Sequence, residues 1–491
     1  MPNRLVMRRG VSQHGFAARK PILIRDTTWL TSSEIISVLL ALIGQVILTR
    51  AVIQSDYGLW ILLMDIFTAI FLIVDAGLPT IISRDGANRP NVLRKAVKKV
   101  WKLQIIVAIP FVIIGLPCVI LLNNAPTELI ILAAFICLVH IASYAPRTAL
   151  RAAGQARFEA ISKVVERLLI TIGYGILFIS ESSSILNYAL VFTLGSLAGL
   201  LTSIFLLYKS IPQSNERIDE LGKSWVSTKS LLVSALPFAV TLGVLPYITR
   251  IEKFFLAGIS LESVAIFHVG QLAWMAGMIV PISISSALLP ILGENRSNPE
   301  RFRKELDKAI IPIKILLVAG FILGSIFVTL ILPVAFPEEY TNSTNGLTSL
   351  EVFIYLLSGW GFSLLAAPWN SALKAGENPW MYTLFITLVV ILATLVAWAF
   401  IPSYGLSGAV LSANITCFLM LSMGILLSGD SKRALSGSRK YDWILMISLC
   451  VFYPIAWDIN KSLAITLGLM IGLKIWIIHK LVNNNSLGES E

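Results

Sequence analysis

Three charged residues stand close together in an apolar run at residues 229–258. They are Arg250, Glu252 and Lys253. A charge in such surroundings is costly, so it needs a partner, a function or a path to water. On an α-helix, Arg250 and Lys253 lie about 60° apart, whereas Glu252 points about 160° away from Arg250. The two cations could therefore hold one anionic group, Arg250 as a forked donor and Lys253 as a point charge.

Three further ionisable side chains occur in long apolar runs. Asp65 lies at a depth comparable to that of Arg250, and could either pair with a cation or carry a coupling ion. Arg50 ends the first run and fits either an interfacial anchor or a cavity residue. His268 fits either a titrating group or an interfacial histidine with satisfied hydrogen bonds. The candidate binding residues are thus Arg250, Lys253, Glu252, Asp65, Arg50 and His268.

For Arg250 and Lys253 there is a second interpretation. Both side chains could extend to the nearer membrane interface, with Glu252 paired internally. No catalytic residue and no metal site is expected, because the chain contains no HExxH sequence and no paired-carboxylate site. Its four cysteines all lie in apolar runs, where sulfur behaves as an ordinary apolar group. No cofactor is expected either.

The composition indicates which kind of secondary structure positions these residues. Of 491 residues, 56% are hydrophobic and 14% are charged, against about 25% charged in an ordinary globular protein. The mean hydropathy is +0.80. A water-soluble protein of this size could not cover its surface, and a disordered chain would hold far less apolar material. The chain is therefore expected to be an all-α, polytopic membrane protein.

Runs of roughly 20 apolar residues predict about 14 transmembrane helices. They cover residues 31–53, 57–83, 100–122, 126–148, 160–180, 184–208, 229–258, 263–291, 309–335, 350–372, 379–401, 404–428, 442–458 and 462–480. Basic residues gather in alternate connections, those near 84–99, 147–167, 209–229, 293–308 and 429–441. The positive-inside rule places these connections and both termini in the cytoplasm, so we expect a multi-pass protein of the cytoplasmic membrane. The net charge of +11 is read as a topology signal and not as a nucleic-acid surface.

The sequence also repeats itself. NVLRKAVKKV (91–100) resembles ERFRKELDKA (300–309), and ALRAAGQ (149–155) resembles ALKAGEN (372–378). Each member of the second pair follows a proline that stands eight residues before its glycine. An offset of six spans predicts two parallel six-helix bundles, related by an axis along the membrane normal. The alternative is that basic loops after apolar spans simply look alike.

This repeat predicts a division of the chain into five parts. They are a cytoplasmic N-terminal segment (1–28), a first bundle (29–208), a cytoplasmic linker (209–228), a second bundle (229–428) and two C-terminal helices with a tail (429–491). Transporters built from such repeats place the substrate between the halves, which rock against each other. The residues between the predicted bundles are therefore of most interest.

Several segments resemble one family of transporters. LTRAVIQSDYGLW (48–60), DAGLP (75–79), RIEKFFLAG (250–258), ALKAGEN and IPSYGLSGAV (401–410) resemble the polysaccharide-biosynthesis flippases. These form the O-antigen-transporter-like branch of the multidrug/oligosaccharidyl-lipid/polysaccharide exporter superfamily. The resemblance covers most of residues 30–430. Glu252-Lys253 stand where the family usually has Asp-Arg, which leaves the role of that carboxylate open.

The resemblance implies a MATE-like fold and a function. The function is translocation of a polyprenyl-(di)phosphate-linked oligosaccharide across the cytoplasmic membrane by alternating access. Arg250 and Lys253 would then hold the diphosphate of the lipid carrier. The partners implied are this lipid-linked oligosaccharide, membrane lipids and other polysaccharide-assembly proteins, with no nucleic acid. The absence of a Walker A sequence and of any long soluble segment argues against an enzyme.

Two other functions fit the same residues. A multidrug or small-cation antiporter of the same fold would use Asp65, Glu252 or Asp75 to couple transport to H⁺ or Na⁺. A membrane scaffold for a polysaccharide-assembly complex would need no transport at all.

Overall fold

A computed structural model describes residues 14–488 apart from short gaps at 87–88, 123–124, 214, 297, 343–345, 377–378 and 429–437. Within these ranges the chain is helical and contains no strand. Eleven helical segments are long and apolar enough to cross a membrane. The all-α, polytopic architecture expected from composition is confirmed.

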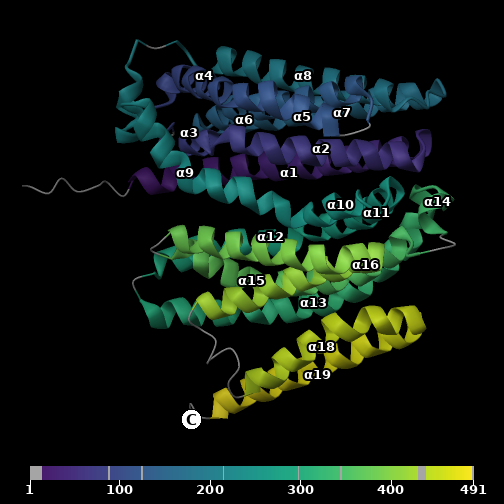
Figure 1. The fold of residues 1–491 in the computed structure, drawn as a ribbon. Helices are drawn as coiled ribbons and strands as arrows, with labels where there is room; N and C mark the ends of the chain where they lie inside the picture. Colours follow the sequence, from purple (N-terminus) through teal and green to yellow (C-terminus); the bar gives the residue numbers. More distant parts are fainter. Residues whose placement is uncertain are drawn as a thin grey trace, which may run out of the picture.

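The first half of the chain forms one group of helices (Figure 1). In order they are α1 (His14–Ala51), α2 (Gln54–Asp75), α3 (Leu78–Gly86), α4 (Leu93–Pro110), α5 (Leu116–Leu122), α6 (Thr127–Ala152), α7 (Ala156–Ile179) and α8 (Ile185–Ser210). Contacts join α1 to α7, α7 to α8 and α6 to α8. These helices therefore pack mainly on one another.

The second half forms another group beside the first (Figure 1). It contains α9 (Thr228–Val244), α10 (Ile251–Leu256), α11 (Leu261–Gly277), α12 (Ile279–Glu294), α13 (Pro299–Ala335), α14 (Glu338–Thr341), α15 (Ser349–Ala375) and α16 (Pro379–Leu427). The buried helix α15 packs against α11, α12, α13 and α16. It is the core of this group.

Two C-terminal helices follow, α18 (Ser438–Ile459) and α19 (Lys461–Gly488). They lie against the second group only, on the side away from α1–α8 (Figure 1). Lys314 on α13 forms an ion pair with Asp442 on α18. The hydroxyls of Ser325 and Tyr453 are 2.8 Å apart at the same seam. Polar contacts inside an apolar interface thus fix the register of the appended pair.

The predicted number of spans agrees with these helices once the breaks are considered. The predicted spans 379–401 and 404–428 both lie in α16, which is two helices separated by a kink at Gly405, where φ is 55° and ψ is −127°. Two other predicted spans, α7 and α19, fall outside the eleven segments. Counting α16 twice and adding α7 and α19 recovers the prediction of about 14 spans. The basic residues in the first turns of α7 are what separate it from the other spans.

The two groups of helices meet along α2. Its first turns pack against α11, where a Cβ added to Gly58 would lie 2.0 Å from the carbonyl oxygen of Leu261. Its last turns and α3 pack against α9. We call the end of the helices that holds Lys98, Lys163 and Lys304 the basic end, and the other the far end. The residues in the middle of α2 therefore lie at the interface of the two groups.

Candidate functional site

The charged residues of the second group lie just after a break in a helix. Helix α9 ends at Val244, and residues Leu245–Thr249 form a 3₁₀ turn before α10 begins. The expected continuous helix over 229–258 is wrong here because Pro246 has no N–H to donate. The freed carbonyls find side-chain donors. The Arg250 guanidinium donates to the carbonyl oxygen of Pro246 at 2.9 Å, and the Gln271 amide to that of Thr249 at 3.0 Å.

Asp65 joins both cations of α10 to the first group of helices. The Arg250 Nε atom lies 2.8 Å from Asp65 Oδ1, and the Lys253 Nζ atom lies 2.5 Å from Asp65 Oδ2. Asp65 sits roughly 16 Å along α2 from Gln54, close to the middle of this 22-residue helix. We call Asp65, Arg250 and Lys253 the central triad. It pairs charges between the two groups at mid-membrane depth.

The central triad is largely enclosed and carries one positive charge in excess. The side chains of Lys253, Asp65 and Arg250 are 3%, 14% and 18% exposed. Ionic interactions are much stronger in such surroundings than in water. A single carboxylate shared between two cations leaves an unbalanced cation, and Arg250 keeps the most exposed side chain of the three. The arrangement attracts an anion rather than a metal ion or a second cation.

His268, the remaining candidate on the second group of helices, lies beside the triad. Its Nδ1 atom is 3.4 Å from the Lys253 Nζ atom, and its ring centroid is 6.0 Å from that of Tyr57. An ammonium group has hydrogens to donate and no lone pair to accept with. Nδ1 of His268 therefore accepts from Lys253, which leaves the ring proton on Nε2. Its place on α11 makes it a second contact for Lys253 inside the second group.

Glu252 lies apart from the triad. It is 1% exposed, its carboxylate forms no ion pair with a described residue, and the polar side chain beside it is that of Ser412 on α16. Helix α10 also packs against α16, which is a different helix from α2, the helix that carries Asp65. The separation of Glu252 from the two cations thus agrees with the sequence-based expectation. An internal ion pair for Glu252, the second interpretation above, is not formed in the described part of the chain.

Arg50 acts at the far end of the helices and not in the triad. Its guanidinium donates to the carbonyl oxygens of Val334 at 2.6 Å and Ala335 at 2.9 Å, the last residues of α13. Those carbonyls have no partner within their own helix, so a cation there satisfies them and complements the helix dipole. Because Arg50 belongs to α1, this cap ties the two groups together. Gln54 adds a weaker contact to the Glu339 carbonyl oxygen at 3.4 Å.

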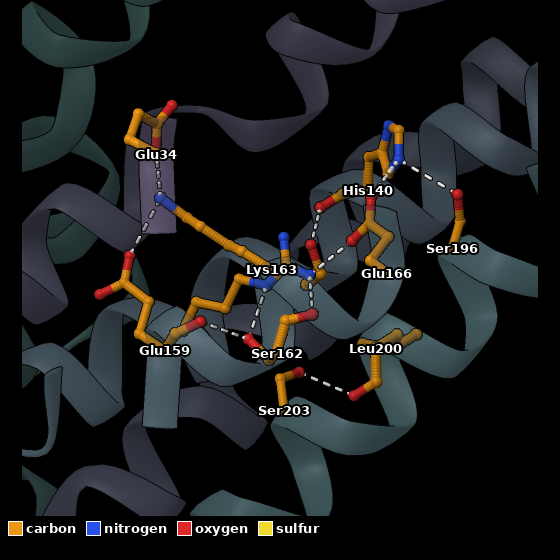
Figure 2. A network of polar contacts seen from close by, with 11 residues as sticks. Glu34, His140, Glu159, Ser162, Lys163, Glu166, Ser196, Leu200 and Ser203 are labelled. Carbon is orange, nitrogen blue, oxygen red and sulfur yellow. Dashed lines mark hydrogen bonds and ion pairs between the residues drawn. The ribbon is translucent and has the colours of Figure 1, made fainter. Parts of the chain in front are cut away.

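A second polar cluster lies inside the first group (Figure 2). The Arg147 guanidinium donates to Glu166 Oε2 at 2.5 Å, and His140 Nε2 lies 3.1 Å from Glu166 Oε1. The same histidine nitrogen is 3.2 Å from the Ser196 hydroxyl. Lys163 connects the cluster to α1 through Glu34 at 3.2 Å. Every partner belongs to α1, α6, α7 or α8, so the cluster holds these helices together.

The importance of Glu166 and Arg147 was not apparent from the sequence. Both fall where the basic connection 147–167 overlaps the predicted spans 126–148 and 160–180, so their charges read as topology signals. Helix α6 in fact continues to Ala152 and α7 already begins at Ala156, so the connection is short. The signal that could have found them is helical spacing, since Glu159, Lys163 and Glu166 recur every three or four residues. In the described ranges, no three His, Cys, Asp or Glu side chains gather to hold a metal ion.

Solved structures share this arrangement of helices. A transporter of the MOP superfamily from Pyrococcus furiosus, described by the reversed polarity of its binding pocket, superposes with a TM-score of 0.58 at 18% identity, over 85% of this chain and 96% of its own. The lipid II flippase MurJ in an inward closed conformation gives 0.63 at 14% identity, over 93% and 99%. An outward-facing multidrug resistance MATE transporter gives 0.56 at 16% identity, over 84% and 96%. The chain therefore has the fold of this superfamily.

Comparison of the sequence with protein families agrees. No curated protein matches the chain. A family model described as "Polysaccharide biosynthesis protein" matches residues 23–296. This stretch covers more than half of the chain and includes Arg50 and the entire central triad. The chain belongs to the polysaccharide biosynthesis protein family.

Proposed function

We propose that the protein translocates a polyprenyl-(di)phosphate-linked oligosaccharide across the cytoplasmic membrane by alternating access. The central triad carries this proposal. It places excess positive charge midway through the membrane and between two groups of helices. A diphosphate matches it, because arginine and lysine are the side chains that bind phosphate oxygens best. The family match and the fold shared with a lipid II flippase support the same substrate class.

The orientation follows from the basic end. Lys98, Lys163 and Lys304 lie in the first turns of α4, α7 and α13, and Lys209 lies in the last turn of α8. By the positive-inside rule this end faces the cytoplasm and the far end faces outward. Both termini are then cytoplasmic. The headgroup enters from the basic end and leaves at the far end, while the polyprenyl tail stays in lipid.

Binding of the substrate would compete with an existing ion pair. Asp65 belongs to α2, whereas Lys253 belongs to α10 and Arg250 is the residue that precedes α10. A diphosphate that takes up both cations releases Asp65 and removes the charged link between the groups. Substrate binding thereby weakens the interface that must rearrange, which gives the binding energy a mechanical use. After release of the substrate, Asp65 re-forms both ion pairs.

The structure has the far end closed. Arg50 caps α13, and Tyr57 meets Tyr340 edge-to-face with ring centroids 6.2 Å apart. The outward step of the cycle has to break these contacts. Arg50 is thus proposed as a latch between α1 and α13, and Asp65 as the link that substrate breaks. The two are independent contacts on different helix pairs.

A second candidate function rests on Glu252. A carboxylate that is 1% exposed and forms no ion pair with a described residue is typical of residues that couple transport to H⁺ or to another cation. This favours the antiporter alternative, or a flippase driven by a cation gradient. The Glu252→Gln variant distinguishes these: we expect a flippase to keep gradient-independent exchange of its lipid substrate. An antiporter would instead lose cation-driven drug export in vesicles and show no lipid translocation at all.

The first prediction concerns the two cations. In proteoliposomes, Arg250→Ala with Lys253→Ala should slow translocation of a fluorescent polyprenyl-diphosphate oligosaccharide at least tenfold, since the diphosphate loses both of its partners. Arg301→Ala with Lys304→Ala, which removes two exposed cations from α13, is the matched control and should leave the rate unchanged.

Loss of both cations also leaves Asp65 buried and unpaired, which by itself can unfold a protein. The triple variant Asp65→Asn, Arg250→Gln, Lys253→Met removes every charge of the triad and avoids this difficulty. We expect it to fold, to reach the membrane in normal amounts and still to fail in translocation. Wild-type rates from the triple variant would refute the proposed role.

The second prediction concerns the latch. Arg50→Ala removes two hydrogen bonds that hold the far end closed, so the population open at that end should rise by about 30-fold, from about 1 kcal/mol per bond. With spin labels at the exposed positions Ile53 and Val334, double electron–electron resonance would show this opening as a longer distance between the two labels. Arg157→Ala, at the basic end, is the control. An unchanged distance distribution in Arg50→Ala would show that Arg50 is an anchor only.

A further inference from the structure

An apolar groove runs along the outside of the first group of helices. It has a volume of about 620 Å³ and lies between α4, α6 and α8. Its walls are apolar except for Gln104, and its residues on α4 and α8 include Ile105, Ile109 and Ile204. From Trp101 to Ile113 it follows α4 and the π-helical turn after it (Phe111–Gly115) for roughly 18 Å, slightly more than one leaflet of a hydrocarbon core about 30 Å thick. The groove thus has the length of one acyl chain.

The groove opens onto unpaired cations at the basic end. Lys98 and Lys102 continue the same face of α4 by one turn beyond Trp101 and Ile105, and both are exposed. On α8, Tyr208 follows Ile204 by one turn and is exposed, and the next residue, Lys209, is exposed with its Nζ atom 5.9 Å from the Phe205 ring centroid. The Lys98 Nζ atom lies 6.0 Å from the Tyr208 ring centroid. An aromatic ring and cations from two helices therefore meet at the mouth of the groove.

Nearby acidic residues do not neutralise this mouth. In the linker, Glu216 and Glu220 lie 3.9 and 3.4 Å from Arg89, and Asp219 lies near Lys99. Lys95 and Lys99 donate to backbone carbonyls, at 2.7 and 2.8 Å. Lys98, Lys102 and Lys209 form no ion pair with any described residue. Three exposed lysines without an ion-pair partner are thus available at the end of the apolar groove.

We infer that this groove binds an anionic glycerophospholipid of the leaflet at the basic end. One acyl chain lies between α4 and α8, and the phosphate lies among Lys98, Lys102 and Lys209 with Tyr208 beneath it. A polybasic surface attracts an anionic headgroup by about 1 kcal/mol per cation. The site is separate from the central triad, whose residues lie on α2 and α10. Its lipid would join α4 to α8 in the first group.

The test is a titration of purified protein in neutral detergent with phosphatidylglycerol or phosphatidylcholine, followed by native mass spectrometry and by the melting temperature. Wild-type protein should bind phosphatidylglycerol at least tenfold more tightly than phosphatidylcholine and melt at a higher temperature with it. The triple variant Lys98→Gln, Lys102→Gln, Lys209→Gln should lose the preference for phosphatidylglycerol. Arg301→Gln, Arg303→Gln with Lys304→Gln, a set of equal charge on exposed residues of α13, should keep it.

A second variant tests the groove with all charges intact. Ala142→Phe fills the floor of the groove and should weaken phosphatidylglycerol binding at least fivefold. Equal preference in the two charge variants would overturn the site, as would unchanged binding in Ala142→Phe. Displacement of phosphatidylglycerol from the groove by a short polyprenyl diphosphate at equal concentration would assign the groove to the transported lipid instead and would also overturn it. Translocation that is normal in the Lys98, Lys102 and Lys209 variant leaves the lipid site intact.

Discussion

The structure depends on one carboxylate that serves two cations across the interface of two groups of helices. Asp65 on α2 meets Arg250 and Lys253 on α10 where a charge without a partner would be costly. Removing either side leaves the other buried, so the two groups are held together at mid-membrane depth. The same excess charge offers a place for an anion. Under the proposed function, the stability of this conformation and the affinity for substrate compete for the same two side chains.

Much of the fold could be predicted from the sequence. The apolar runs predict the order of the helices, but several helices extend beyond them, as α13 does by beginning at Pro299 where the run begins at 309. Asp65, Arg250, Lys253 and His268 are candidates on one physical ground, namely that an ionisable side chain in hydrocarbon is costly and so indicates a partner or a function. That Glu252 would point away from the cations followed from helical periodicity, although α10 is only six residues long. The repeat remains a prediction. Pro146 and Pro368 both lie inside helices, α6 and α15, but Gly154 has a φ of 71° whereas Gly376 has a φ of −58°.

Other features depend on contacts between residues far apart in the chain. Arg50 could be read as an anchor or a cavity residue because nothing near it in the sequence reveals the carbonyls of α13, nearly 300 residues later. The charges of Glu166 and Arg147 favour a basic connection when the sequence alone is considered. In the structure these two charges neutralise each other and His140 lies within hydrogen-bonding distance of the carboxylate, which lets the helices continue through them. Charge marks the end of a span only where its partners are absent.

The most direct test is a structure of the protein with a bound polyprenyl diphosphate. The account predicts phosphate oxygens within hydrogen-bonding distance of Arg250 and Lys253, and an Asp65 carboxylate that has moved away from both. A diphosphate bound elsewhere, with the two ion pairs of Asp65 unchanged, would contradict it.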